Sequence, residues 1–112
     1  MTRISRRAAL AGLLGSGLLP KVTMSANYST GVTDGRILLG QPIAYSGPAS
    51  AYGSIGKVHL AYFKMLNQKG GIRGRKIEII SVDDGYNPAR TVQVVRRMVE
   101  QDQVFAIFGI AG

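Results

Sequence analysis

Hydrophobic residues form short and long segments that alternate along the chain from Arg36 onward. Short apolar runs bounded by glycine, proline or charged residues occupy residues 37–45, 77–82 and 104–109. Their brevity and their β-branched residues favour buried strands over helices. Two longer segments between them carry apolar residues at helical spacing. The order strand, helix, strand, helix, strand predicts an α/β fold in which a parallel sheet is covered by helices on both faces.

Both helical segments carry start or stop signals. In the first, five residues recur at helical spacing up to Asn67: Ile55, Val58, Tyr62, Met65 and Leu66. Gly70 and Gly71 follow, and glycine favours the left-handed conformation that ends a helix. The second helix is predicted to begin at Asn87 and Pro88, because asparagine caps helices and proline is tolerated at the first helical position. Its predicted buried stripe consists of Val92, Val95, Met98 and Val99.

The carboxyl ends of parallel strands are where ligands of such sheets bind. Three segments are predicted at that edge, namely residues 45–56, 83–87 and 109–112. Pro42 lies near the end of the first strand, where a missing N–H group does least damage. The sequence stops directly after the third strand, and a sheet of this size would leave one edge and one face open. This pattern indicates a truncated product or a fragment of a longer protein.

The first 26 residues have the layout of an export signal. Arg3, Arg6 and Arg7 precede an apolar stretch over residues 8–19, and small residues follow near Ala26. The stretch is shorter than the roughly 20 residues that span a bilayer, which favours a cleaved peptide over an anchor. The arginine pair resembles a twin-arginine signal, with an ordinary secretory signal as the alternative. Residues 27–35 are predicted to form a flexible lead-in, with order beginning near Arg36.

Charge and cysteine content exclude several classes of protein. The net charge is +8, but the predicted signal supplies four basic residues and no acid, which leaves ten basic against six acidic residues, or +4. The one basic cluster after the signal, residues 73–76, is predicted to be a solvated turn, so no nucleic-acid partner is expected. Without any cysteine, the chain can form neither a disulfide nor a lipid-attached terminus, which predicts a soluble exported protein that is not a lipoprotein.

The loop SGPASAYGSIG, residues 46–56, raises the question of phosphate binding. Its glycines are too widely spaced for a dinucleotide fingerprint, and no GK[ST] sequence is present. Asp83 and Asp84 could be paired catalytic or metal-binding carboxylates, but at a strand end they more often hold a turn and cap the next helix. His59, the single histidine, is predicted to be a surface or partly buried helical residue. No catalytic residue, metal site or cofactor is predicted, and an enzyme is disfavoured.

Tyr52 is the strongest candidate ligand contact. Its ring can form an apolar wall and its hydroxyl can hydrogen-bond, and the small residues around it leave room for a small molecule. The structural alternative is a tyrosine that packs over the helix start. Backbone N–H groups at that start would favour an anionic group such as a carboxylate. Ser46 and Ala51 on the same loop and Gly109 after the third strand are the further candidate ligand-binding residues.

Residues 36–112 resemble the beginning of the periplasmic leucine/isoleucine/valine-binding proteins of ABC transporters. The matching elements are SGPASAYG, then NQKGGIRGRKIEIISVDDGYNPARTVQVVRRMVEQD, and then FAIFG. The resemblance implies two α/β lobes that close on a solute by hinge bending and dock on a membrane permease. It also implies that the tyrosine of the SGP loop, here Tyr52, faces the cleft. Asp83, Asp84 and Pro88 match positions that are mainly structural in that family.

The resemblance further implies that most groups that hold the ligand follow the third strand or belong to a second lobe. The leading hypothesis is therefore a partial N-terminal lobe, residues 36–112, of an exported solute-binding component of an ABC uptake system. Its expected partners are an amino acid or a related small carboxylate or amide, and an inner-membrane permease. The alternatives are a nucleotide-binding α/β enzyme fragment and a remnant without activity.

Overall fold

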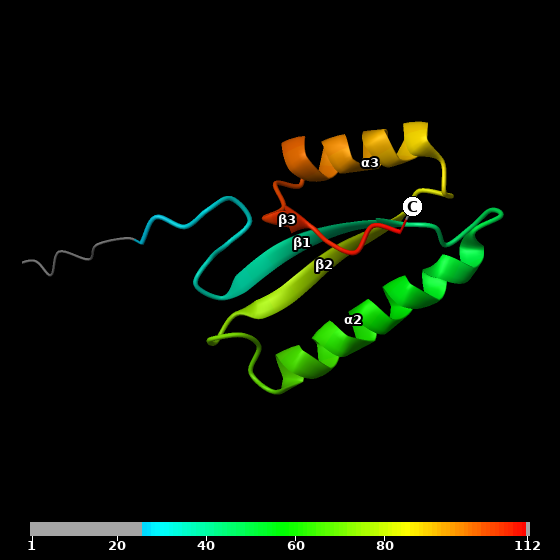
Figure 1. Cartoon of the computed structure of the whole chain (residues 1–112). Helices are drawn as coiled ribbons and strands as arrows, with labels where there is room; N and C mark the ends of the chain where they lie inside the picture. The colour runs from blue at the N-terminus through cyan, green and yellow to red at the C-terminus, as the bar shows by residue number, and fades with distance from the viewer. Residues whose placement is uncertain (1–25, 112) are drawn as a thin grey trace, which may run out of the picture.

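The computed structural model describes residues 26–111, which form an α/β unit with the element order predicted from the sequence (Figure 1). The elements are β1 (Arg36–Ile43), the 3-10 turn η2 (Ser50–Tyr52), α2 (Gly53–Gln68), β2 (Lys76–Asp83), α3 (Pro88–Glu100) and β3 (Ala106–Ile107). The predicted fold class, a parallel β-α-β-α-β arrangement, is confirmed. The predicted export signal, apart from Ala26, lies outside the described residues. No helix in residues 26–111 has the length and hydrophobicity needed to cross a membrane.

The sheet has three parallel strands in the order β2-β1-β3, with α2 and α3 on opposite faces (Figure 1). β1 and β2 pair over their full length, from Arg36 opposite Lys76 to Ile43 opposite Asp83. β3 is shorter than the predicted run of residues 104–109. Its pairing nevertheless extends by one hydrogen bond at each end, because the amides of Phe105 and Phe108 donate to β1 carbonyls at 2.8 Å.

Pro42 lies on the central strand, and the hydrogen-bond pattern explains why it is tolerated. The carbonyls of Leu38 and Gly40 accept hydrogen bonds from the β3 side. The backbone nitrogen of Pro42, two residues further on, therefore points to that same side of β1. β3 ends opposite Gly40, so the missing N–H of Pro42 interrupts no strand pairing.

The apolar core lies between the sheet and α3. Leu38, Met98 and Val104 form its buried cluster, and partly buried residues from both outer strands and α3 pack against it. α3 starts as predicted, because the Asn87 side chain accepts a hydrogen bond from the Arg90 amide at 3.1 Å and Pro88 is the first helical residue. The predicted stripe of α3 is corrected in part.

Two of the four residues predicted for that stripe point to solvent. Val92 and Val99 are 59% and 55% exposed, whereas Met98 is 1% exposed and Val95 is half-buried. The face on the sheet is rotated toward Thr91 and Val94, because these two residues and Met98 share one side of the helix at spacings of three and four.

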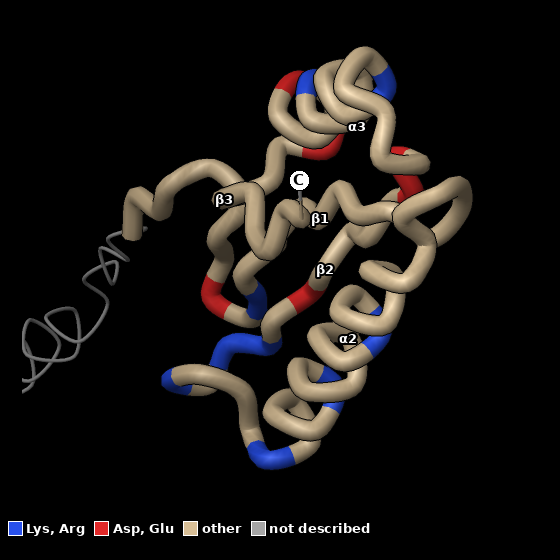
Figure 2. Tube along the Cα trace, turned by 45° about the vertical axis from the view of Figure 1, so that its right-hand side comes forward, with Lys and Arg blue, Asp and Glu red and all other residues tan. Residues whose placement is uncertain are grey.

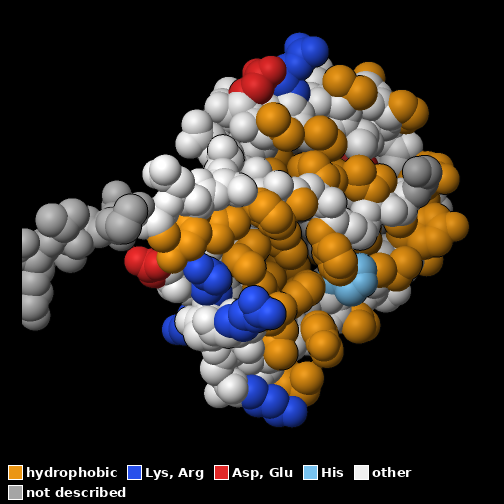
Figure 3. Space-filling view, turned by 60° about the vertical axis from the view of Figure 1, so that its left-hand side comes forward, with side chains coloured by type: hydrophobic (Ala, Val, Ile, Leu, Met, Phe, Trp, Pro, Cys, Tyr) orange, Lys and Arg blue, Asp and Glu red, His pale blue; other side chains and the backbone are white. Residues whose placement is uncertain are grey.

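α2 is confirmed as a helix, but four of its five regularly spaced apolar residues are exposed, and only Leu66 is half-buried. Ile55, Val58, Tyr62 and Met65 are all 39% exposed or more. Figure 3 shows that hydrophobic side chains cover much of one face of the molecule. The sheet side instead carries two buried glycines, Gly53 and Gly56, followed by half-buried side chains. Glycine is required there because a Cβ atom at Gly56 would lie 2.3 Å from the Tyr45 hydroxyl.

The segment before β1, for which the sequence predicts a flexible lead-in, forms hydrogen bonds in the structure. The amide of Leu38 donates to the Gly31 carbonyl at 2.8 Å, and Val32 forms an antiparallel bridge with Ile37. A Cβ atom at Gly31 would lie 2.2 Å from the Phe105 nitrogen. The predicted lead-in therefore folds back against β1 and β3 from Ser29 onward.

The core assignment predicts a large contrast between two neighbouring residues of α3. Met98→Ala should lower the free energy of unfolding by about 2–5 kcal/mol, because it removes a buried side chain and leaves a cavity. Val99→Ala, at a 55% exposed position, should change it by about 0.5 kcal/mol or less. Urea denaturation followed by circular dichroism would measure both values, and equal losses would contradict the assigned core.

Candidate functional site

The loop after β1 and the turn after β2 lie together at the carboxyl edge of the sheet (Figure 1). One carboxylate joins them. Asp83 Oδ1 accepts hydrogen bonds from the amides of Tyr45 at 2.8 Å, Ser46 at 3.2 Å and Gly85 at 2.9 Å. Oδ2 accepts a further bond from the Ser46 hydroxyl. The predicted structural role of Asp83 is therefore confirmed, because its carboxylate ties the end of β2 to the loop after β1.

These hydrogen bonds also change the acidity of Asp83. The pKa of its carboxyl is lowered from 3.8 to about 2, first by the Ser46 hydroxyl and then by the Gly85 amide, although desolvation acts in the opposite direction. Donors that favour the ionised form depress a carboxyl pKa in this way. Asp83 is therefore ionised at neutral pH, and its carboxylate oxygens accept hydrogen bonds from groups of the protein itself.

Asp84 has a different set of partners. It is 3% exposed and accepts hydrogen bonds from the Tyr86 amide at 2.9 Å and the Thr91 hydroxyl at 2.8 Å. It thus holds the turn, as predicted, while the cap of α3 is supplied by Asn87. Residues 26–111 contain no group of three or more His, Cys, Asp or Glu side chains arranged to hold a metal ion.

Tyr52 lies at the end of η2, directly before α2. Its side chain is 46% exposed and does not cap the helix. Its ring stacks on that of Tyr86, with centroids 6.0 Å apart and an interplanar angle of 25°. The stacking partner belongs to the turn after β2, and both the ligand contact and the packing role of Tyr52 stay predictions. Tyr86 was not singled out from the sequence, although its segment was placed at this edge.

The other predicted ligand contacts are distributed along the same edge. Ser46 is exposed, but its hydroxyl donates to Asp83, and Ala51 is exposed within η2. Gly109 has a φ of +66°, and a Cβ atom there would lie 2.9 Å from Gln41 Nε2 and 3.0 Å from His59 Cε1. Ser46 and Tyr52 share one loop, whereas Gly109 lies against β1 and α2. All of these ligand-binding roles stay predictions.

A polar network that no local sequence pattern predicts surrounds Gln41. Gln41 is fully buried, its Nε2 lies 2.7 Å from His59 Nδ1, and its Oε1 accepts from the Ser81 hydroxyl at 3.1 Å. The hydroxyls of Ser81 and Tyr45 lie 2.6 Å apart. The available signal was a glutamine inside an apolar strand, since buried polar groups require partners. His59 is partly buried on its helix, as predicted.

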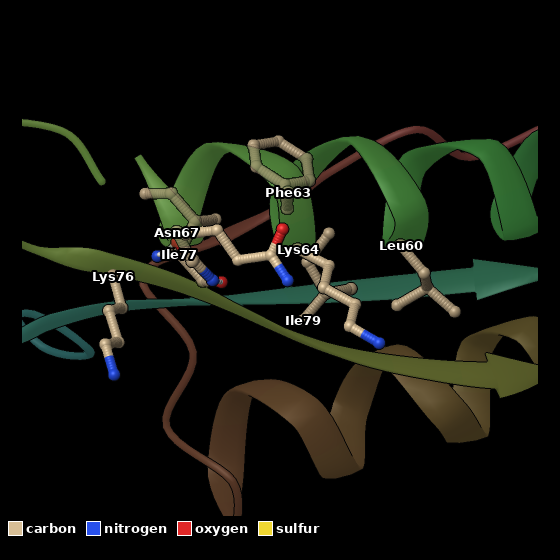
Figure 4. Close-up of a pocket in the computed structure, with 8 residues that line it drawn as sticks. Leu60, Phe63, Lys64, Asn67, Lys76, Ile77 and Ile79 are labelled. Atoms are coloured by element: carbon tan, nitrogen blue, oxygen red, sulfur yellow. Dashed lines mark hydrogen bonds between the residues drawn. The ribbon is translucent and has the colours of Figure 1, made fainter. Parts of the chain in front are cut away.

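Two open hollows on the described part of the chain lie beside α2 and at the carboxyl edge. One, of about 420 Å³, lies between α2 and β2 near Phe63, Lys64 and Ile79 (Figure 4). Within it the Asn67 side chain pairs with the Ile77 backbone through two hydrogen bonds of 2.8 Å, as a neighbouring strand would. This hollow is a gap along an outer strand, away from the carboxyl edge. The other, of about 330 Å³, is at the carboxyl edge and is lined in part by Tyr86 and Ile110.

Basic residues follow α2 and the turn that leads to β2, whereas Asp83 and Asp84 lie at the opposite end of β2 (Figure 2). Of the basic cluster, residues 73 and 74 form a turn closed by a bridge between Ile72 and Arg75, and Lys76 begins β2. The Arg75 guanidinium donates to the Thr33 carbonyl at 2.8 Å and lies 4.9 Å from the centroid of the Tyr28 ring. Arg75 is thus engaged with the segment before β1.

The parallel unit, with a small-residue loop and exposed rings at its carboxyl edge, is part of an α/β lobe of the kind whose ligands bind at the strand ends. The chain belongs to the family described as periplasmic binding protein, which matches residues 37–112. An amino acid binding protein from Pseudomonas aeruginosa is 41% identical over 44 residues, which are 39% of this chain and 12% of that protein.

Two solved structures extend the comparison. A fatty acid ABC transporter substrate-binding protein from Thermomonospora curvata is 30% identical, with a TM-score of 0.62 over 75% of this chain and 21% of that protein. The branched-chain amino acid transporter substrate-binding protein LivJ from Streptococcus pneumoniae, in complex with isoleucine, is 31% identical, with a TM-score of 0.62 over 66% of this chain and 22% of that protein. The chain thus spans about a fifth of these proteins, and its resemblance to the leucine/isoleucine/valine-binding type is confirmed.

The lowered pKa of Asp83 predicts a specific loss of stability in acid. A carboxyl whose pKa is depressed on folding stabilises the protein above its unfolded pKa and loses that effect as the pH falls through its folded pKa. The contribution of Asp83 should therefore be complete above pH 3.8 and disappear toward pH 2. The melting temperature of Asp83→Asn should lie below that of the wild type at neutral pH, and the difference should shrink across this window.

Asp102→Asn, at a carboxylate beyond α3, is the matched control for the same chemical change. The Asp102→Asn variant should lose stability between pH 3.8 and about 2 to the same extent as the wild type. A melting-temperature difference between Asp83→Asn and the wild type that stays constant over that range would refute the role assigned to the Asp83 hydrogen bonds.

Proposed function

We propose that this chain supplies one wall of the solute site in the exported binding component of an ABC uptake transporter. The observation that carries the proposal is the half-exposed Tyr52 ring, held at the carboxyl edge in a loop that Asp83 fixes. Membership of the periplasmic binding protein family and similarity to two ABC substrate-binding proteins support it. The solute would be bound and delivered to a permease without chemical change.

An amino acid or a related small carboxylate or amide suits the chemistry of this edge. The Tyr52 ring offers an apolar surface and its hydroxyl a hydrogen-bonding group, and Ala51 beside it leaves space. Two relatives, an amino acid binding protein and a binding protein in complex with isoleucine, support the same class of solute. Ser46 and Gly109 would line this wall mainly with backbone atoms, because the Ser46 hydroxyl is bonded to Asp83.

Nucleotide binding is the rival function, and the glycines of the loop count against it. In phosphate-binding loops, glycines allow the backbone to approach the phosphate groups closely. Here Gly53 and Gly56 instead allow α2 to approach the Tyr45 side chain, since a Cβ atom at either position would lie within 2.9 Å of it. These two glycines are therefore explained by packing between α2 and the end of β1.

Removing the Tyr52 ring tests the proposal directly. Tyr52→Ala should weaken solute binding at least about tenfold, because an aromatic contact and a hydrogen bond together contribute about 1.4 kcal/mol or more. Calorimetry of the full chain against a panel of amino acids and nucleotides would measure the change. Tyr28→Ala is the matched control, since Tyr28 is also exposed but contacts Arg75 before β1.

Two results would count against this function. Tight binding of a nucleotide would favour the rival enzyme class, and solute affinity that is unchanged in Tyr52→Ala would remove Tyr52 from the site. Absence of binding to every member of the panel would support a remnant without activity.

We further propose that residues 1–26 direct export by the twin-arginine route. Conservative replacement of Arg6 and Arg7 with lysine should then retain the chain in the cytoplasm, because the route depends on the arginine pair. Cell fractionation with immunoblotting would follow the location of the chain, with Arg3→Lys as the control. Normal export of the double variant would point to the ordinary secretory route.

A further inference from the structure

Tyr86 occupies a backbone conformation that is unfavourable for a tyrosine. Gly85 and Tyr86 have φ values of +61° and +58°, and the Asn87 amide donates to the Asp84 carbonyl at 3.1 Å. Positive φ at both central residues is the mark of a type I′ turn, in which glycine or asparagine is preferred at the position of Tyr86. A bulky side chain with positive φ persists only where its surroundings hold it, and such residues cluster at functional sites.

Neighbouring groups hold this turn in place. The Tyr86 amide donates to the buried Asp84 carboxylate at 2.9 Å, and the Gly85 amide donates to Asp83 at 2.9 Å. On the other side, Gly47 lies so close that a Cβ atom there would be 3.1 Å from the Gly85 carbonyl. The backbone of Tyr86 is therefore held both by carboxylates at the end of β2 and by the loop after β1. This restraint reduces the entropy that would be lost when a ligand binds.

The ring itself is not buried by these contacts. Tyr86 is 47% exposed, although its ring stacks on that of Tyr52 with centroids 6.0 Å apart and an interplanar angle of 25°. The two rings thus form an aromatic wall, defined here as the Tyr52 and Tyr86 side chains, across the loop after β1 and the turn after β2. A wall of nearly parallel rings presents flat π surfaces, on which a planar ring can stack in an offset arrangement.

The hollow of about 330 Å³ begins at the same ring. Pro88, Val92 and Ile110 add apolar surface to it. Its polar lining groups include Asp84 and Thr91, which are hydrogen-bonded to each other at 2.8 Å. Because these two polar groups already satisfy each other, an apolar group of the solute can enter the hollow without leaving them unpaired. Small-molecule sites commonly combine an apolar lining with a few polar groups.

We propose that Tyr86 is a specificity-determining residue of the solute site, and that the aromatic wall selects carboxylates or amino acids that carry a planar aromatic ring. This inference rests on the proposed function. It extends the site from the loop after β1 to the turn after β2. It also explains why a tyrosine stands where the turn favours glycine or asparagine.

The test compares aromatic with aliphatic solutes in three forms of the full chain. The wild type should bind phenylalanine at least about tenfold more tightly than leucine, measured by calorimetry. Tyr86→Phe should keep that ratio, because the ring is retained. Tyr86→Asn should abolish the preference while its melting temperature stays equal or rises, because asparagine suits the left-handed conformation.

Tyr28→Asn is the matched control, since it removes an exposed tyrosine from a loop before β1 and should leave the ratio unchanged. A preference for phenylalanine that survives in Tyr86→Asn would overturn the inference. Equal affinities of the wild type for phenylalanine and leucine would also overturn the inference. Binding of either solute would nevertheless support the proposed function. Failure of the wild type to bind any carboxylate or amino acid would overturn both.

Discussion

The arrangement of the carboxyl edge depends on the hydrogen bonds that Asp83 accepts. A loop with three glycines and three serines has much conformational freedom, and ordering it opposes folding by roughly 1–2 kcal/mol per residue. Asp83 restricts that freedom at the point where the loop leaves β1, because one carboxylate binds the amides of Tyr45 and Ser46 together with the Ser46 hydroxyl. Its lowered pKa reflects these same bonds. The loop after β1 and the turn after β2 are therefore fixed relative to each other by the protein's own hydrogen bonds.

The other side of the loop is held by packing and by a polar network. Gly53 and Gly56 bring the first turn of α2 against Tyr45, whose hydroxyl continues into the chain of Ser81, Gln41 and His59. Because this contact determines which side of α2 faces the sheet, it also explains why the regularly spaced residues Ile55, Val58 and Tyr62 point outward. Close approach of two backbones and satisfaction of a buried glutamine together set the rotation of the helix, and hydrophobic spacing alone does not.

The difference between local sequence signals and tertiary contacts explains which features the sequence could predict. Element order, the parallel sheet, the Asn87 cap and the structural role of Asp83 all follow from local signals such as β-branched runs, capping residues and acids at a strand end. The buried stripe of α3 is predicted only in part, because a helix face depends on what packs against it. The Gln41 network joins residues 40 positions apart, so no local pattern reveals it. Tyr52 could be singled out from its small neighbours, whereas its stacking on Tyr86 requires the register of β1 and β2.

The carboxyl edge separates the groups that hold the backbone from the groups that remain available for a ligand. The carboxylates of Asp83 and Asp84 are used in hydrogen bonds to amides and hydroxyls, so they add little free charge to the edge. The Tyr52 and Tyr86 rings, in contrast, keep nearly half of their surface exposed although their backbones are fixed. A rigid backbone with exposed rings is suited to one side of a binding cleft, because little further ordering is needed when a solute arrives. The chain spans about a fifth of the solved relatives, so the proposed solute site would need a further wall opposite this edge.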